Sequence, residues 1–240
     1  MNGEIQHIFR EPSKAEVTCM ILHNRKRKLY VGDSAGKVFT LNIKNGTKIK
    51  KFKSHTDEVT SLYYWEGSED VKLLISSSWD GSVIVHDDSK SDPVGIVRYN
   101  KIKHKGSANS VSFKENDGIV ASCSDDQTII LTNLNTYRQE ASALHHEAEV
   151  KNLLFLNPHD CLASSDLAGK LYFWATTPSR IRNTLLLEVP NMVISSTGEA
   201  DYCPIRALVF YAAEEILFTA DDNGNIRKWN VGPLLSKLAS

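Results

Sequence analysis

The stretch 221–224 (Asp-Asp-Asn-Gly) contains residue types that bind calcium in proteins. If it were a calcium-binding loop, its register would place Thr219 at the first ligand position and Asn230 at the twelfth. Calcium loops of this kind end on a bidentate glutamate, which this stretch lacks. Asn-Gly is instead typical of a tight hairpin turn, so we interpret the stretch as a turn without a metal.

The other residues that could do chemistry stand isolated. His145, His146 and Glu147 could contact a metal, but adjacent residues of a strand or turn point in different directions. The four cysteines are far apart and never form a Cys-x-x-Cys pair, so neither a zinc site nor a thioredoxin-type site is indicated. No phosphate-binding loop is present. We therefore predict a non-enzymatic protein without a metal or another cofactor.

The composition is that of an ordinary globular protein. The chain has 240 residues, of which 41% are hydrophobic and 24% charged, enough for one large β domain or two small ones. Its first residues form no apolar run typical of a secretory signal, and no apolar stretch is long enough to cross a membrane. The dispersed cysteines favour a reducing compartment. These features predict a cytoplasmic location.

A five-fold internal repeat is the strongest signal in the sequence. Five windows share an apolar start, small polar residues, a turn and a second apolar run, and they cover residues 29–42, 74–87, 120–133, 162–175 and 217–230. The residues at their turns are Gly36, Gly81, Gln127, Gly169 and Gly224, at spacings of 45, 46, 42 and 55 residues. Repeats of this length point to an array of similar structural units.

Each window is predicted to be the centre of a small antiparallel sheet. A β-prone stretch precedes every window, as at 59–65, and weaker ones follow, as at 47–52. Runs such as 83–85 are apolar at every position, which indicates strands covered on both faces. Four-stranded sheets that bury one another predict an all-β fold, a β-propeller with five blades. The expected blades are 17–54, 55–104, 105–145, 146–190 and 200–230.

The five windows resemble the WD-repeat family over residues 17–230. In that family a His before the first strand, a Ser or Thr on the second, an Asp in the turn and a Trp on the third form a hydrogen-bonded relay. The resemblance implies a structural role for the residues at those positions, which are His55, Ser76, Asp80, Ser122, Asp126, His146, Ser164, Trp174, Thr219 and Trp229.

No repeat contains the complete relay. His86 stands at the Trp position of the second repeat, Ala168 at the Asp position of the fourth, and Asp201 at the His position of the fifth. Although Trp79 precedes Asp80, the pair is not the family's dipeptide: Asp80 is at the turn position, and Trp79 is an extra turn residue expected at the rim. We therefore expect apolar packing between blades to hold the fold together.

Five repeats leave two arrangements open, because seven blades are usual in the family. The blades could close into a five-bladed ring, with the N-terminal segment 1–16 adding an outer closing strand to the last blade. They could instead be part of a larger propeller. The tail 231–240 shows no clear fourth strand, which favours the larger propeller.

The fourth and fifth repeats resemble the end of a propeller in large WD-repeat proteins of cilia and flagella. The residues that carry this likeness are Trp174, Ala175, Pro178, Ser179, Arg182 and Asn183. The resemblance implies a non-enzymatic scaffold in the axoneme.

Positive charge is concentrated in the first repeat. Residues 23–53 contain ten basic residues and one acid, although the whole chain has a formal net charge of −1. In one interpretation the lysines protect an outer strand from edge pairing. In the other, which we favour, this blade binds an acidic partner. The candidate binding residues are Arg25, Lys26, Arg27, Lys28, Lys48, Lys50, Lys51 and Lys53.

These observations predict a protein-interaction scaffold in a ciliary, axonemal or other microtubule-associated assembly. The expected partners are proteins with acidic surfaces, such as tubulin tails or axonemal complex subunits, and the expected location is the cytoplasm, within a cilium or flagellum axoneme. The alternative is a propeller that binds nucleic acid or anionic phospholipid through the basic first blade. Tyr30, Phe39 and Phe52 are interleaved with the basic residues, but strand aromatics more often pack inside a blade than stack on bases.

The insert before the last repeat is a second candidate surface. The longer spacing there leaves about ten extra residues, and 192–202 is polar enough to form a loop. Long loops on rigid scaffolds often carry binding residues. A disordered excursion is the other interpretation.

Overall fold

The computed structural model describes residues 8–9, 13–23, 27–67, 71–89, 94–176, 184–194 and 200–239. Over these residues the chain forms strands β1 to β21 and one helix, α1. The strands build four four-stranded sheets, one three-stranded sheet and a two-stranded hairpin, so the predicted all-β class is confirmed.

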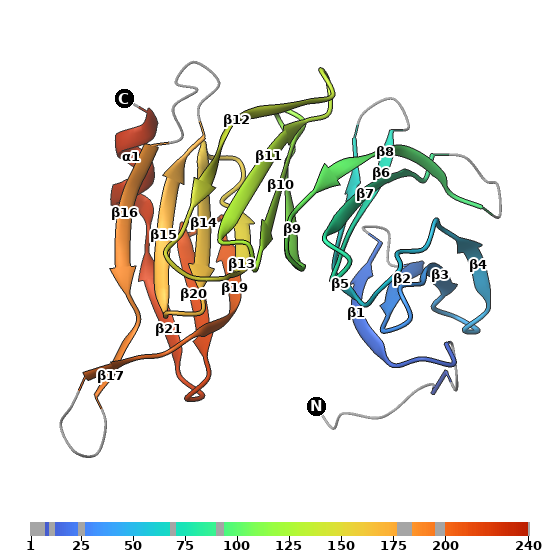
Figure 1. The fold of residues 1–240 in the computed structure, drawn as a ribbon, viewed down its shortest axis with the longest axis horizontal. Helices are drawn as coiled ribbons and strands as arrows, with labels where there is room; N and C mark the ends of the chain where they lie inside the picture. Colours follow the sequence, from blue (N-terminus) through green and yellow to red (C-terminus); the bar gives the residue numbers. More distant parts are fainter. Residues whose placement is uncertain are drawn as a thin grey trace.

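The strands of each sheet follow one another along the chain and pair antiparallel, so that each sheet is one blade (Figure 1). Blade one contains β1 (Val17–Leu22), β2 (Lys28–Asp33), β3 (Val38–Asn42) and β4 (Lys48–Lys51). Blade two contains β5 (Val59–Glu66), β6 (Lys72–Ser78), β7 (Ser82–Asp87) and β8 (Ile96–Lys103). Blade three contains β9 (Ala108–Lys114), β10 (Ile119–Ser124), β11 (Thr128–Asn133) and β12 (Arg138–His145). Blade four contains β13 (Val150–Phe155), β14 (Cys161–Asp166), β15 (Lys170–Ala175) and β16 (Thr184–Pro190).

The last blade differs from the others. Blade five has three strands, β19 (Ile205–Tyr211), β20 (Ile216–Asp221) and β21 (Ile226–Asn230). The tail then forms α1 (Gly232–Ala239), whose Leu235 is buried in the apolar cluster between blades four and five. The helix thus follows the third strand where the other blades have a fourth strand.

The turn glycines explain why the hairpin signature recurs. Gly36, at the β2–β3 turn, has a φ of 76°. Residues with a Cβ adopt this backbone conformation only at a cost in free energy. A Cβ there would also lie 2.5 Å from the backbone oxygen of His55, the residue that leads into the next blade. The turns at Gly36, Gly81 and Gly169 are packed in this way against the backbone that leads into the next blade, and a residue without a Cβ permits that approach.

Apolar side chains between successive blades form the core. Ala121, Ile129 and Leu131 of blade three pack with Leu153 and Phe155 of blade four in one buried cluster. Similar clusters join blades two and three, and blades four and five. Burial of apolar surface is favourable, so these clusters stabilise the contacts between neighbouring blades.

A ladder of side-chain hydrogen bonds also links the innermost strands. Each bond runs from a polar side chain of one inner strand to the first backbone oxygen of the next inner strand. The bonds are Thr18 to Val59, Thr60 to Ala108, Asn109 to Val150 and Asn152 to Ile205. The ladder therefore joins each blade to the next, from blade one to blade five.

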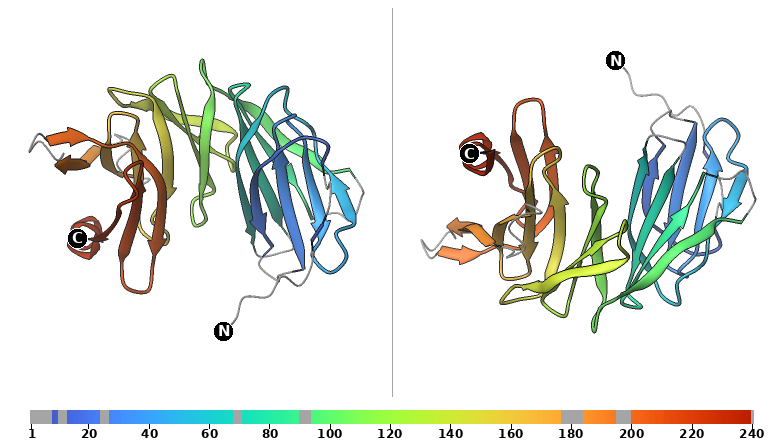
Figure 2. Two further views of the ribbon diagram at one scale, coloured as in Figure 1. Left: turned by 90° about the horizontal axis from the view of Figure 1, so that it is seen from below. Right: turned by 90° about the horizontal axis from the view of Figure 1, so that it is seen from above.

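The five blades are arranged as an open arc. Figure 2 shows blade one and blade five at opposite ends, with a gap between them. Residues 4–7 and 10 of the predicted closing strand lie outside the described residues, and the Phe9 ring lies beside Gly46 of blade one.

The outward face of blade five lacks the cover that the other blades have. Strand register aligns Leu171 of β15 with Ile226 of β21, and Leu156 with Tyr211. Leu171 and Leu156 are fully buried against blade five, whereas Ile226 is 76% and Tyr211 50% exposed. The arc therefore ends on an apolar sheet face.

Candidate interaction surface

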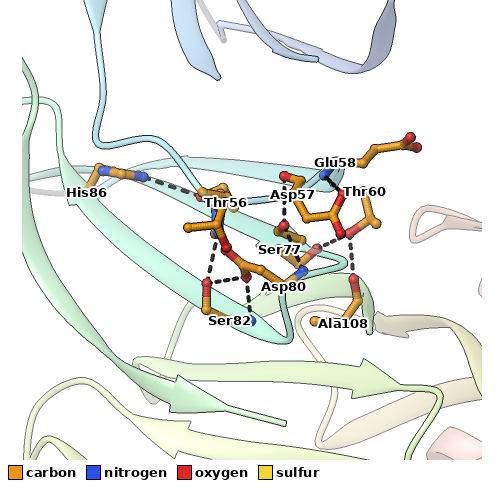
Figure 3. Close-up of polar contacts among 12 residues, drawn as sticks. Thr56, Asp57, Glu58, Thr60, Ser77, Asp80, Ser82, His86 and Ala108 are labelled. Carbon is orange, nitrogen blue, oxygen red and sulfur yellow. Dashed lines mark hydrogen bonds and ion pairs between the residues drawn. The ribbon is translucent and has the colours of Figure 1, made fainter. Parts of the chain in front are cut away.

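The second repeat places its relay residues together at one end of the blade. His55 Nε2 lies 2.8 Å from Ser76 Oγ, and His86 Nε2 lies 3.3 Å from the same oxygen. Asp80 accepts hydrogen bonds from the backbone nitrogens of Ser82, at 2.8 Å, and Thr56, at 2.9 Å (Figure 3). The carboxylate thus ties the turn of this blade to the loop that enters it.

The protonation of these groups follows from burial and hydrogen bonding. Burial lowers the pKa of His55, and it lowers the pKa of His86 to about 3. Burial alone would raise the pKa of Asp80, but the hydrogen bonds from Ser82 and Thr56 outweigh it and lower that pKa to about 2. Both histidines are therefore neutral and Asp80 is charged at neutral pH.

The third repeat contains a histidine that the sequence interpretation missed. His104 Nε2 lies 2.8 Å from Ser122 Oγ, and His104 Nδ1 lies 3.2 Å from Asp126 Oδ2. Its distance to Ser122 along the chain, eighteen residues, equals that from His146 to Ser164. This spacing was the signal that could have identified it.

In the fourth repeat the carboxylate comes from a position other than the one expected. His146 Nε2 and Trp174 Nε1 both lie 2.8 Å from Ser164 Oγ. With Ala168 at the Asp position, the sequence predicted a fourth repeat without a carboxylate in its relay. This prediction is wrong, because Asp166 Oδ2 lies 3.2 Å from His146 Nδ1. Asp166 stands at the start of the turn, where it also accepts a hydrogen bond from the Lys170 nitrogen at 3.0 Å.

The fifth repeat keeps one predicted pair and changes another. Trp229 Nε1 donates to Thr219 Oγ1 at 3.0 Å. Asp201 does not occupy the histidine position, since it lies in the hairpin strand β18 (Ala200–Tyr202). Asn191 takes that position instead: its nitrogen donates to the Gly169 oxygen, and its Nδ2 lies 3.3 Å from Asp221 Oδ2.

Blade one has a reduced version of the same arrangement. Ser13 stands at the histidine position and donates through Oγ to Asp33, which also accepts from the Ala35 and Lys37 nitrogens. The relay side chains of all five blades are therefore mostly buried and bonded to each other. Such groups stabilise turns and are not placed to act on a substrate.

Gly32, Asp33, Ser34, Ala35 and Gly36 fit the Gly-x-Ser-x-Gly pattern of hydrolase nucleophiles, which our sequence interpretation overlooked. In hydrolases this pattern forms a sharp turn from a strand into a helix. Here it forms the end of β2 and the hairpin turn to β3. The pattern therefore reflects turn geometry.

The structure describes six of the eight basic residues predicted for the binding surface, and one of these six is buried. Arg25 and Lys26 lie outside the described residues, and Arg27, Lys28 and Lys53 are at least partly exposed. Lys50 is only 6% exposed, because its Nζ forms an ion pair with Asp88 Oδ1 at 2.7 Å. Tyr30 donates to the other oxygen of that carboxylate, so the prediction of Lys50 as a binding residue is wrong. Lys50 instead links blade one to blade two.

Three other lysines surround a groove on blade one, which we call the lysine groove. Its volume is about 260 Å³, and its lining consists of Lys37, Val38, Phe39, Lys48, Lys51, Phe52 and Ser54. Lys48 Nζ lies 4.5 Å from the centre of the Phe39 ring. Within the described part of the chain, no carboxylate forms an ion pair with Lys37, Lys48 or Lys51. Lys37 was not among the residues predicted for this surface.

The aromatic side chains near the groove are not available for stacking. Tyr30 is fully buried, Phe39 is 2% exposed and Phe52 is 5% exposed. Their rings pack inside blade one and against blade two. A platform for nucleic-acid bases would need exposed ring faces.

A second hollow, of about 230 Å³, is lined by residues of the innermost strands and by Trp79, which is half exposed. Its other lining residues are Thr18, Glu58, Thr60, Asn109, Lys151, Asn152 and Arg206. Here Lys151 pairs with Asp125 and Glu149, and Arg206 pairs with Asp222. Because these cations are already compensated, this hollow attracts an external charge less than the lysine groove does.

The insert before blade five is a hairpin, made of β17 (Met192–Ile194) and β18. It projects from the blades in Figure 1 and exposes Met192 and Tyr202 by 47% and 54%. Residues 195–199 lie outside the described residues. The antiparallel pairing of these two strands favours the interpretation of a defined arm over a disordered excursion.

Among the residues that the structure describes, no three His, Cys, Asp or Glu side chains are grouped to hold a metal ion. No helix in the same residues is long and apolar enough to span a membrane.

Comparison with known proteins identifies relatives of this fold. Residues 46–87 and 98–133 match the family model "WD domain, G-beta repeat". The chain is 25% identical over 103 residues to Cilia- and flagella-associated protein 337 B of Tetrahymena thermophila, covering 43% of this chain and 8% of that protein. It is 25% identical over 178 residues to Nuclear distribution protein PAC1 of Candida glabrata, covering 70% and 38%. It thus spans less than half of either relative.

A solved structure supports the same assignment. The chain superimposes on a chain of the mitotic checkpoint complex with a TM-score of 0.72 and 18% identity, covering 89% of this chain and 61% of that one. WD40 propellers are generally non-catalytic and bind other proteins. Together with the repeated hairpins and blades, these matches confirm WD repeats at residues 46–87 and 98–133 and a β-propeller fold for the described chain.

Proposed function

We propose that this propeller is a non-catalytic docking platform in a ciliary or other microtubule-associated assembly, and that its first blade contacts an acidic protein surface. The observation that carries the proposal is the lysine groove. Its three ammonium groups have no carboxylate partner in the described residues, so a partner that supplies negative charge gains an attraction that the propeller itself does not satisfy.

The likeness to Cilia- and flagella-associated protein 337 B supports the ciliary setting. Binding of nucleic acid through this blade has less support, because the three interleaved aromatic rings are buried. The location that follows from the proposal is the cytoplasm, at the axoneme.

Detergent extraction of cilia tests this proposal. The tagged protein should remain with the axoneme at low salt and be released as salt rises, because exposed charge pairs are screened. Recovery of all the protein in the detergent-soluble fraction at low salt would show that it does not dock there.

A further inference from the structure

Blades one and four share a hairpin turn but differ in the charges around it. The turns read Asp33-Ser-Ala-Gly-Lys37 in blade one and Asp166-Leu-Ala-Gly-Lys170 in blade four. In both turns the first Asp accepts a hydrogen bond from the nitrogen of the closing lysine. The two lysines therefore occupy equivalent places.

In blade four the lysine is neutralised by two carboxylates. Lys170 Nζ lies 2.5 Å from Glu147 Oε2 and 3.0 Å from Glu188 Oε1. Glu188 stands opposite Tyr172 on the outer strand β16, and Glu147 stands three residues before the first residue of β13. The hydrogen bonds to these two glutamates raise the pKa of Lys170 above its ordinary value.

In blade one the same positions carry lysines. Lys51 stands opposite Phe39 on β4, as Glu188 stands opposite Tyr172 on β16. Lys14 stands three residues before β1, which is the position of Glu147 in blade four. Blade one thus has lysines at the positions that carry the partners of Lys170 in blade four, and Lys48 adds a further positive charge over the Phe39 ring.

We infer that the lysine groove binds a carboxylate-rich peptide segment of a partner, whose carboxylates neutralise the groove's lysines as Glu147 and Glu188 neutralise Lys170 in blade four. This inference rests on the proposed function and names the chemistry of its partner. Carboxylates are favoured because the equivalent site in the same molecule is completed by them at hydrogen-bond distance.

A fluorescence anisotropy titration with a labelled oligoglutamate peptide tests the inference on the full chain at low salt. Lys51→Glu should weaken binding on the order of tenfold, because it removes one cation and places a carboxylate beside Lys37. The matched control is Lys44→Glu, which makes the same charge change at an exposed residue outside the groove. It should change the affinity by about twofold or less.

Thermal unfolding separates a binding effect from a folding effect. Lys51→Glu recreates the Lys170–Glu188 pair of blade four, so its Tm should equal or exceed that of the unchanged protein. No peptide binding, or an equal loss with Lys44→Glu, would overturn the inference. Tighter binding of oligouridylate RNA, or of phosphatidylcholine vesicles carrying phosphatidylserine, through the same lysine would overturn it too. If the protein stays on axonemes but binds no oligoglutamate, the docking role stands, whereas the acidic contact of the first blade fails together with the inference.

Discussion

At the scale of single residues, His86 shows how burial controls charge. It is fully buried at the tryptophan position of the second repeat, and burial lowers its pKa to about 3. In the unfolded chain the histidine has an ordinary pKa near 6.5. Below that value the unfolded state binds a proton that the folded state does not, so stability is lost as the pH falls from about 6.5 towards 3.

His86→Phe should remove most of this pH dependence. Between pH 7.5 and pH 5.0 the histidine should lower the free energy of unfolding by about 2 kcal/mol, a loss that phenylalanine cannot show. Urea unfolding at the two pH values measures it, and the exposed His145→Phe serves as the control. An identical pH dependence in the unchanged protein and His86→Phe would contradict the neutral, buried assignment.

Asp166 accepts two of the hydrogen bonds that hold the turn of blade four. Asp166→Ala leaves His146 Nδ1 and the Lys170 nitrogen without their acceptor inside the blade. Loss of such buried bonds should cost about 1–3 kcal/mol in the free energy of unfolding. Ala168→Ser, at the position to which the sequence assigned the carboxylate, should change it by less than about 0.5 kcal/mol. A larger effect at Ala168 than at Asp166 would reverse our assignment.

At the scale of elements, β15 in blade four and β21 in blade five differ in the burial of equivalent residues. Leu171→Ala opens a cavity between blades four and five and should cost about 2–5 kcal/mol. Ile226→Ala changes the equivalent position of blade five, which is 76% exposed, and should cost less than about 0.5 kcal/mol. Chemical denaturation of both variants compares them, and equal losses would mean that the outward face of blade five is covered in solution.

The strands and turns could be predicted from the sequence, whereas the partners of the buried polar side chains could not. Strands and turns follow from local apolar runs and from turn residues such as Gly36, so the propeller class was predictable. The hydrogen-bond partners of buried polar groups were not predictable, because they depend on which side chains lie close together in the folded chain. Asn191 is separated from blade five by the hairpin insert, and Lys50 finds Asp88 in another blade. Charge alone could not distinguish Lys50 from Lys51, which forms no ion pair within the described part of the chain.

At the scale of the whole molecule, the arc of blades carries several distinct surfaces. The lysine groove lies on blade one, the hairpin arm lies before blade five, and an apolar face ends the arc. Surfaces at separate places on one scaffold can bind different partners at once, which is what a docking platform requires.

Chemical cross-linking of intact axonemes, followed by mass spectrometry, tests the central claim most directly. We expect cross-links between this chain and axonemal proteins, concentrated on the exposed lysines of blade one and on acidic segments of the partners. The Lys51→Glu variant should lose the blade-one cross-links while other links persist. An absence of cross-links from this chain to any axonemal protein would contradict the account.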